Sequence, residues 1–177
     1  YTIVYNLDGG VNDGNNPDGY TIETDDIILK AAIRNGYTFV GWFDAGADGN
    51  KITEIAKGSI GNKTLYARWA INQYTVTFVD HDGTVLKEEI VNYNSGATAP
   101  ADPERIGYTF TGWDRGFDNI VANMTITALY DIDKYTVTYK DHNGEIINIS
   151  IVDSGSSATG QVPPIRIGYT FIGWDKD

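Results

Sequence analysis

The sequence contains no cysteine, two histidines and one methionine. Without cysteine there is no disulfide framework, no thiolate zinc site and no cysteine nucleophile. Two histidines leave little material for a histidine-rich metal site or a histidine-based catalytic triad. Basic residues are also scarce: 13 Lys and Arg stand against 24 Asp and Glu, which gives a net charge of −11 and an isoelectric point near 4.4. This balance argues against binding to the phosphate backbone of nucleic acids.

Long apolar segments are missing as well. No run approaches the roughly 18 residues of a membrane-spanning helix, so we expect no membrane insertion in this segment. The first residues do not read as a signal peptide, and if the protein is exported we expect its targeting segment to lie outside this sequence. What the chain does contain is 20 Gly, 12 Tyr and 4 Trp. This aromatic content is enough to build folded cores, which excludes an acidic disordered tail.

Two motifs recur three times in the same order. The heptapeptide Gly-Tyr-Thr-Phe-x-Gly-Trp begins at Gly36, Gly107 and Gly168. A segment opening with Tyr-Thr-Ile/Val precedes each copy and begins at Tyr1, Tyr74 and Tyr135. The spacing between the two motifs is 35, 33 and 33 residues. Agreement in both order and spacing predicts three tandem units, which we place at residues 1–73, 74–133 and 134–177.

A third landmark closes the first two units. It reads Thr64-Leu-Tyr-Ala-Arg-Trp69 in the first unit and Ile126-Thr-Ala-Leu-Tyr130 in the second. The sequence ends at Asp177, before a third copy of this landmark. We therefore predict a third unit that is truncated and lacks its closing strand. The unpaired edge at residues 135–139 would then invite strand exchange with another chain or with residues outside this sequence.

Within each unit the pattern predicts mainly β structure, α+β at most. Alternating apolar and polar residues after Tyr74 and Tyr135 are typical of half-buried strands. Turn residues at Asp82-Gly83 and Asn143-Gly144 predict hairpins. The return strands are expected at residues 84–93 and 145–153.

The heptapeptide is expected to form the third strand of every unit. Its second glycine is placed for a β-bulge that re-aims the following tryptophan. The last strand is expected at residues 64–69 or 124–131. Residues 25–34 fit a short helix or a strand equally well.

Together the three motifs resemble the Listeria–Bacteroides surface repeat, and the second and third units resemble the related internalin-type B repeat. The resemblance covers essentially the whole chain, and Leu7-Asp-Gly-Gly10 and Ile55-Ala-Lys-Gly-Ser59 match the longer variant in the first unit. It implies small β-grasp-like modules in an elongated tandem array on secreted or wall-attached bacterial proteins. Such repeats act as stalk or adhesin segments, so the implied partners are surface proteins or glycans of host or neighbouring cells. No catalytic residue is implied.

The candidate site residues are the nine aromatic residues of the heptapeptides. They are Tyr37, Phe39, Trp42, Tyr108, Phe110, Trp113, Tyr169, Phe171 and Trp174. We favour a core role, because one buried tryptophan contributes about 150–250 Å² to a small module. The alternative is a carbohydrate-binding module, in which exposed Trp and Tyr form a platform for sugars.

Two groups of polar residues have the composition of metal ligands. His81 and His142 each follow an aspartate and suit zinc, but both lie beside a turn glycine, and we favour a turn role. Four residues of one loop, Asp8, Asp13, Asn15 and Asp18, suit Ca²⁺, although their spacing is not that of an EF-hand and a flexible hairpin loop has the same composition. We expect no metal and no cofactor.

No arrangement in the sequence indicates catalysis. Paired carboxylates such as Asp25-Asp26 and Glu88-Glu89 would point to opposite faces of a strand or lie in solvated loops. Asn62, Asn123 and Asn148 match glycosylation acceptors, which are incidental if the source is bacterial, as the resemblance suggests. We therefore expect a non-catalytic, extracellular spacer segment. Linkers of about four residues, at 70–73 and 131–134, would make it semi-rigid.

Overall fold

The computed structural model describes residues 1–175. These residues form strands, turns and loops and contain no helix, so the predicted mainly β fold is confirmed. Residues 25–34 include the short strand β2 rather than a helical turn. The strands are β1 (Ile3–Asn6), β2 (Ile27–Ile28), β3 (Tyr37–Phe43), β4 (Lys51–Ile52), β5 (Glu54–Ile55), β6 (Lys63–Ile71), β7 (Gln73–Val79), β8 (Val85–Asn92), β9 (Tyr108–Trp113), β10 (Met124–Ile132), β11 (Lys134–Lys140) and β12 (Ile146–Asp153).

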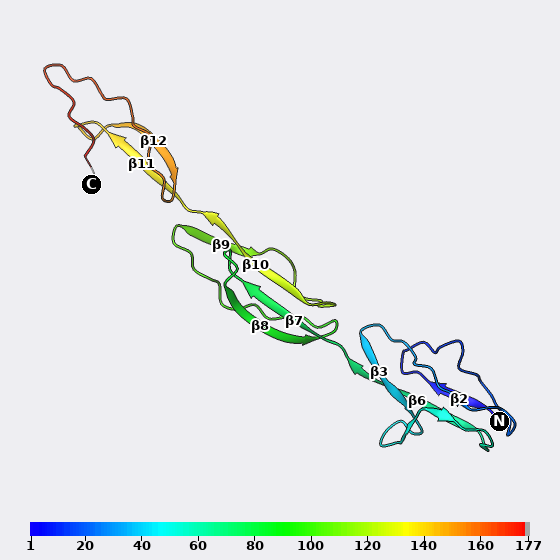
Figure 1. Cartoon of the computed structure of the whole chain (residues 1–177). Coiled ribbons are helices and arrows are strands. Elements are labelled where there is room, and N and C mark those ends of the chain that lie inside the picture. Colours follow the sequence, from blue (N-terminus) through cyan, green and yellow to red (C-terminus); the bar gives the residue numbers. More distant parts are fainter. Residues whose placement is uncertain (176–177) are drawn as a thin grey trace. The chain divides into compact units, whose positions relative to one another are not determined.

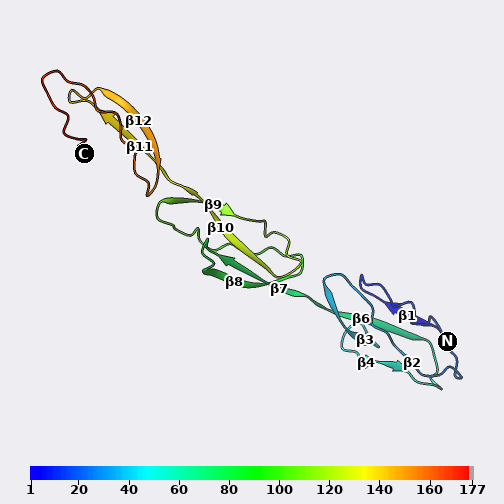
Figure 2. The same ribbon diagram turned by 45° about the horizontal axis from the view of Figure 1, so that its top comes forward.

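The first repeat is built on a four-stranded sheet of order β1-β6-β3-β4 (Figures 1 and 2). Its closing strand β6 lies between β1, to which it runs parallel, and β3, to which it runs antiparallel. A small antiparallel pair, β2 and β5, completes the module. Its core contains eight buried side chains: Ile3, Tyr20, Ile27, Ala32, Trp42, Ile55, Leu65 and Ala67.

The second repeat repeats this plan in a sheet of order β8-β7-β10-β9. The predicted hairpin turn between β7 and β8 is confirmed. Gly83 has a φ of 87°, and the Gly83 N–H donates to the carbonyl of Asp80 at 2.9 Å. Its first and closing strands contribute the buried residues Val76, Phe78, Ile126 and Ala128, and Ile120 is buried in the loop before β10.

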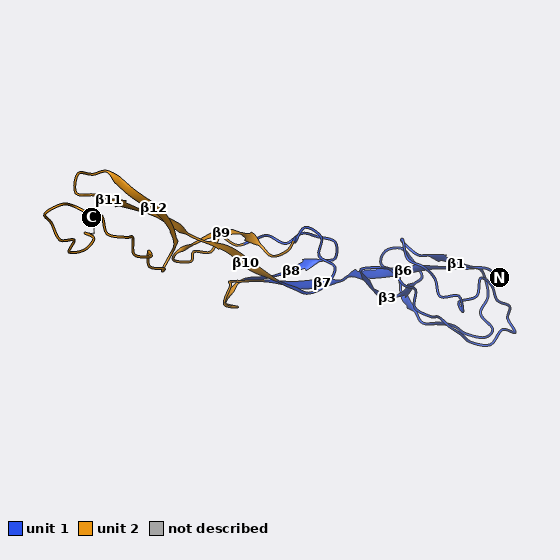
Figure 3. Cartoon of the chain, turned by 90° about the horizontal axis from the view of Figure 1, so that it is seen from above, with its two compact units in different colours: residues 1–77, 87–99, 116–125 blue, residues 78–86, 100–115, 126–177 orange. Residues whose placement is uncertain are grey.

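The chain divides into two compact units, and the division passes through the second repeat (Figure 3). One unit holds residues 1–77, 87–99 and 116–125. The other holds residues 78–86, 100–115 and those from 126 onward. The contacts that carry the arguments below lie within one unit or the other.

The predicted bulge of the heptapeptide is confirmed in the first two repeats. Pairing of β3 with β6 shifts register between Phe39 and Gly41, whose φ is 152°. Pairing of β9 with β10 shifts at the equivalent position, where Gly112 has a φ of 133°. The extra residue in the strand places each tryptophan opposite an alanine: Trp42 opposite Ala67 and Trp113 opposite Ala128. A small residue is needed there because the indole occupies the space above it.

The third repeat departs from the expected plan. Its first hairpin forms as predicted, with β11 antiparallel to β12. Its heptapeptide, at residues 168–174, was expected to be a strand, and this expectation is wrong: the segment pairs with no strand of the described residues. The physical reason is that a strand exists through its ladder of hydrogen bonds, and in the other repeats the closing strand supplies that ladder.

The predicted four-residue linkers are also wrong. Strand β6 ends at Ile71 and β7 begins at Gln73, so one residue, Asn72, separates the first repeat from the second. Strand β10 ends at Ile132 and β11 begins at Lys134, so Asp133 alone separates the second from the third. The other residues of the two predicted linkers belong to the flanking strands.

Candidate functional site

The heptapeptide tryptophan is the centre of an aromatic cluster in every repeat. In the first repeat the Trp42 ring meets Tyr5 and Phe39 edge-on, with centroids 5.0 and 5.3 Å apart. Trp42 is 2% exposed, and its Nε1 donates to the carbonyl of Lys30 at 2.8 Å. Its ring faces and its polar atom are therefore all engaged within the protein.

The same cluster recurs with the same geometry. Trp113 contacts Phe78 and Phe110 at centroid distances of 5.0 and 5.3 Å. Trp174 contacts Tyr139 and Phe171 at 5.1 and 5.2 Å. The sequence analysis missed the first-strand member of each cluster, although an aromatic residue at the fifth position of the opening motif is visible in all three units.

Exposure of the nine candidate residues differs between the repeats. Trp42 is buried, and Tyr37, Phe39, Tyr108, Phe110, Trp113 and Trp174 are partly buried. In the third repeat Tyr169 and Phe171 are exposed, at 67% and 38%. The structure thus brings Phe and Trp together in each heptapeptide, while the cluster of the third repeat is open to solvent.

The heptapeptide tyrosine has a different partner that the sequence analysis missed. An arginine three residues earlier covers its ring: Arg34, Arg105 and Arg166 lie 3.9, 3.6 and 3.7 Å from the ring centroids of Tyr37, Tyr108 and Tyr169. The tyrosine N–H donates to the arginine carbonyl at 3.0–3.1 Å in each copy. The recurring spacing Arg-x-Gly-Tyr was a visible signal for this stacked turn.

The residue between two repeats is held by three hydrogen bonds. The Asn72 N–H donates to the carbonyl of Gly36 at 2.9 Å, and its carbonyl accepts from Tyr93 N–H at 2.8 Å. Its side-chain oxygen accepts from the Thr38 hydroxyl at 2.7 Å. Asn72 therefore binds the heptapeptide of the preceding repeat and the return strand of the following one.

Asp133 occupies the equivalent position at the next boundary and makes the same bonds. Its N–H donates to Gly107, and its carbonyl accepts from Ser154 N–H, at 2.9 and 2.7 Å. Its carboxylate accepts from the Thr109 hydroxyl at 2.7 Å. We call this three-bond arrangement around Asn72 or Asp133 the junction clamp.

The first glycine of the heptapeptide makes the junction clamp possible. A Cβ on Gly36 would lie 1.9 Å from the Tyr93 ring, and one on Gly107 would lie 2.3 Å from Ser154 Oγ. Both glycines have positive φ, 76° and 77°. Glycine is therefore required twice, by the backbone and by the close approach of the next repeat.

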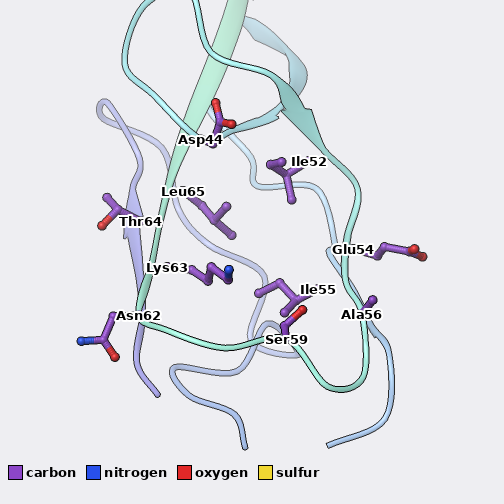
Figure 4. A pocket seen from close by; sticks show the side chains of 10 residues that line it. All are labelled: Asp44, Ile52, Glu54, Ile55, Ala56, Ser59, Asn62, Lys63, Thr64 and Leu65. Carbon is purple, nitrogen blue, oxygen red and sulfur yellow. The ribbon is translucent and has the colours of Figure 1, made fainter. Parts of the chain in front are cut away.

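Two hollows lie on the first repeat. The first, of about 540 Å³, lies beside β4, β5 and the start of β6 (Figure 4). Ile52, Ile55 and Leu65 form its apolar part, and its carboxylates are Asp44 and Glu54. Hydrogen bonds from Asn50 hold the pKa of Asp44 below its usual value, so this carboxylate is ionised at neutral pH and engaged in a turn. This is not the environment of a general acid.

The second hollow, of about 610 Å³, lies over β1, β6 and β3. Tyr37, Tyr66 and Trp69 contribute aromatic side chains to it, and Arg34 and Arg68 contribute positive charge. It combines apolar rings with polar groups, as sites for small ligands do.

The histidine turns use their polar atoms for turn geometry. Asp80 Oδ1 accepts from the backbone N–H of His81 at 2.7 Å, and Asp82 Oδ1 accepts from Thr84 N–H at 2.9 Å. Among the described residues, Asp80, His81 and Asp82 form one group with metal-ligand proximity, their ligand atoms within 4.8 Å of one another. Both carboxylates already accept protein hydrogen bonds, which favours the turn interpretation over zinc binding.

Asp80 also accepts a hydrogen bond from the Tyr130 hydroxyl at 2.6 Å. This bond is the main reason that the pKa of Asp80 is lowered. Desolvation and the same bond raise the pKa of Tyr130 to about 12. The pair ties the first hairpin turn to the closing strand β10.

The acidic loop of the first repeat is ordered by its own side chains. Asp8 pairs with Arg34 at 2.8 Å, and Asp13 Oδ1 accepts from the backbone and side-chain nitrogens of Asn15, both at 2.8 Å. Asn16, which the sequence analysis missed, is 7% exposed and bonds both the N–H and the carbonyl of Lys30. These contacts fix the loop to the rest of the module, which is a structural role for its amide and carboxylate groups.

Two complete β-modules and a third copy with the same hairpin and aromatic cluster define a tandem-repeat segment. The chain belongs to the Listeria-Bacteroides repeat domain family, whose model matches residues 1–68, 74–128 and 135–177. The predicted family and the three repeats are thereby confirmed.

Named relatives come from two bacteria. A Gly-rich membrane protein of Evansella cellulosilytica is 30% identical over 99% of this chain, and Internalin H of Listeria monocytogenes is 38% identical over 64% of it. The chain spans 20% of the length of each of these relatives. Within the described residues, no helix has the length and hydrophobicity needed to cross a membrane.

Proposed function

We propose that this chain is a non-catalytic structural segment of a bacterial cell-surface protein. In this role the tandem repeats act outside the cell as a spacer that carries another part of the protein and offers its sides to neighbouring proteins. Membership of the repeat family and the relatives named as an internalin and a membrane protein support this proposal. The heptapeptide Phe and Trp serve folding in it, since their rings contact one another in each repeat.

The junction clamp is the observation that carries the spacer proposal. A spacer can hold another part of the protein at a defined place only when successive modules cannot rotate freely about the chain that joins them. Here one residue joins two strands, and its N–H, carbonyl and side chain are all bonded. The chain therefore has no free rotation at Asn72 or Asp133 while these bonds persist.

Spin-label distance measurements across the first junction test the proposal. Because the chain has no cysteine, the exposed residues Ile60 and Ile90, which belong to the same compact unit, can be replaced by cysteine and labelled without background. We expect a narrow distance distribution that broadens when Asn72→Gly removes the side-chain bond and loosens the backbone. Thr125→Val, an exposed β10 position outside the clamp, is the matched control and should leave the distribution narrow. A distribution that is already broad in the unmodified chain would contradict a spacer role.

Carbohydrate binding is a second candidate, favoured by the hollow that contains Tyr37, Tyr66 and Trp69. Stacking of a sugar ring there would use the aromatic faces, and the two arginines would hold its hydroxyl groups. A glycan array with the whole chain tests this role. Binding that is lost in Tyr66→Ala but kept in Tyr135→Ala, an exposed tyrosine of β11, would establish it. Absence of binding on the array would contradict a carbohydrate-binding role.

A further inference from the structure

The hollow over β1, β6 and β3 opens in part on the face of the first sheet that is turned away from the core (Figure 2). Leu65 and Ala67 of β6 belong to the core. Side chains alternate along a strand, so Tyr66 and Arg68 point to the opposite face. Asn6 of β1 is the pairing partner of Tyr66. Tyr66, Arg68 and Asn6 all line the hollow, so one ligand there can reach the three of them.

Tyr66 and Arg68 are not needed to build the module. The alanines that lie opposite the heptapeptide tryptophans align the closing strands of the first two repeats. In this alignment the second repeat has Thr127 in place of Tyr66. It has Leu129 in place of Arg68. The second repeat forms the same type of sheet without the two side chains, so their presence in the first repeat calls for another explanation.

Arg68 is a cation that the protein itself leaves largely unused. Its guanidinium carbon lies 3.9 Å from the centroid of the Phe43 ring, which orients the guanidinium plane. Its Nη2 donates to the carbonyl of Ala45 at 3.1 Å, while its Nε is shielded from solvent and has no partner. Among the described residues Arg68 forms no ion pair. It therefore brings a positive charge and unbonded terminal N–H groups to the hollow.

The charge of the hollow is opposite to that of the chain. Two arginines and one aspartate line it, which gives a net charge of +1 in a protein whose net charge is −11. Arg34 is paired with Asp8 at 2.8 Å, so the unmatched charge belongs to Arg68. Asp44, on which Arg68 acts weakly, uses both of its carboxylate oxygens to accept from Asn50. The hollow therefore matches a ligand that carries one negative charge.

We propose that this hollow binds a sugar with a carboxylate on its ring, a uronic acid of an acidic polysaccharide. The inference rests on the carbohydrate-binding candidate above and names its ligand class. The sugar ring stacks on Tyr66, and its carboxylate accepts from the terminal N–H groups of Arg68. Asn6, beside Tyr66, has an amide that can donate to and accept from a sugar hydroxyl.

The spacing of the two main contacts restricts where the carboxylate is attached. Tyr66 and Arg68 are two positions apart on β6, which places their Cα atoms about 7 Å apart. A carboxylate on a carbon of the stacked ring reaches Arg68 over this distance, whereas one at the end of a long substituent would pass beyond it. The geometry thus favours a uronic acid over a sugar with a distant acidic group.

Nuclear magnetic resonance titration of the whole chain with cellobiouronic acid tests the proposal. This disaccharide carries one carboxylate, and its methyl ester is the matched ligand because it keeps the rings and hydroxyls but not the charge. We expect the acid to shift amide signals of β1 and β6 while those of β10 stay unchanged. The ester should bind at least about tenfold more weakly. Added salt should weaken binding of the acid and leave the ester unaffected.

Two variants assign the contacts. Arg68→Leu and Tyr66→Thr introduce the residues that the second repeat has at these positions, so the module should still fold, and the melting temperature checks this. Arg68→Leu should reduce binding of the acid to the level of the ester. Tyr66→Thr should weaken both ligands. Lys140→Gln removes one positive charge at an exposed position of β11 and should leave binding of the acid unchanged.

The outcomes separate this inference from the roles proposed above. Equal binding of acid and ester would overturn it and leave a carbohydrate-binding role intact. Absence of binding by either ligand at millimolar concentration would overturn it together with the carbohydrate-binding candidate, whereas the spacer role is tested separately by the spin-label distances. Equal loss of binding in Arg68→Leu and Lys140→Gln would also overturn it, because affinity would then follow net charge alone.

Discussion

At the scale of single residues, the heptapeptide glycines show how local geometry and packing impose the same choice. Gly36 and Gly168 share a positive φ, 76° and 81°, but their surroundings differ. A Cβ at Gly36 would strike Tyr93, whereas a Cβ at Gly168 would meet nothing within 4 Å. The pair therefore separates the backbone requirement from the packing requirement.

Replacing these glycines by alanine measures the two requirements. Gly168→Ala should cost only the left-handed backbone penalty, about 1–2 kcal/mol of unfolding free energy in its repeat. Gly36→Ala should cost clearly more, because the Tyr93 ring must also move away from the junction. Urea unfolding of the two variants provides the comparison. Equal destabilisation would show that Tyr93 does not approach Gly36 in solution.

The Asp80–Tyr130 pair makes stability depend on pH at both extremes. The folded state raises the pKa of Tyr130 from 10.0 to about 12, so its contribution is complete below pH 10 and is lost as pH rises through about 12. The pKa of Asp80 is lowered from 3.8, so its contribution is complete above that value and is lost as pH falls below it.

Spectrophotometric titration of tyrosine checks this pair. The difference between the unmodified chain and Tyr130→Phe should show one phenol that ionises near pH 12 in the folded protein. Tyr130→Phe should also reduce the decrease in unfolding free energy that occurs as pH rises above 10. A difference titrating near pH 10 would mean that the Tyr130 hydroxyl is neither desolvated nor bonded to Asp80 in solution.

At the scale of elements, the closing strand is the organiser of each repeat. Strand β6 pairs with both β1 and β3 and contributes Leu65 and Ala67 to the core. Its alanine is fixed by the bulge of the heptapeptide, which brings Trp42 directly opposite. In the third repeat, where β11 pairs only with β12 among the described residues, the heptapeptide keeps its turn and bulge geometry but forms no strand.

Enlarging the alanine opposite the tryptophan should disrupt the element. Ala67→Leu should destabilise the first repeat by about 1–3 kcal/mol, since the core offers no space beside Trp42. Ala70→Leu, at an exposed position of the same strand, should change stability by less than about 0.5 kcal/mol. The melting temperatures of both variants test this prediction. Equal shifts would contradict the pairing that places Ala67 opposite Trp42.

Sequence patterns predicted those elements that depend on neighbouring residues. The Asp82-Gly83 turn, the alternating strand that begins at Tyr74 and the bulge at Gly41 follow from short-range chemistry, and all three are confirmed. The Arg-Tyr stacks and the asparagines that bond Thr2 and Thr75 were visible as recurring spacings. The role of the stacks, however, depends on turn geometry, and the asparagines bond residues that are 60 and 48 positions away in the sequence. The third heptapeptide shows the limit most clearly, because its sequence matches the paired copies, yet within the described residues it pairs with no strand.

At the scale of the whole molecule, the three repeats should differ in local stability. Two repeats have four-stranded sheets, while the third has a two-stranded hairpin. Isolated hairpins are marginally stable, and the third repeat adds mainly one aromatic cluster to this hairpin. We therefore expect residues 1–175, taken by themselves, to open from the third repeat while the other two repeats remain folded.

Hydrogen exchange of the free chain tests this order. Amides of β11 and β12 should exchange faster than those of β6, with protection lower by at least about tenfold, because they open without global unfolding. Uniform protection across the three repeats would contradict the difference in their sheets.

The central claim is that the heptapeptide aromatics build repeat cores, and Trp42 tests it most directly. In a variant with Trp69→Phe, Trp113→Phe and Trp174→Phe, Trp42 is the sole fluorophore of its type. Acrylamide quenching of this variant, compared with the same protein in urea, reports access to one indole. The account predicts blue-shifted emission and weak quenching in the folded protein, as expected for a side chain that is 2% exposed. Red-shifted emission that acrylamide quenches as readily as in urea would contradict it. The aromatic residues would then be assigned to an exposed binding surface instead of a core.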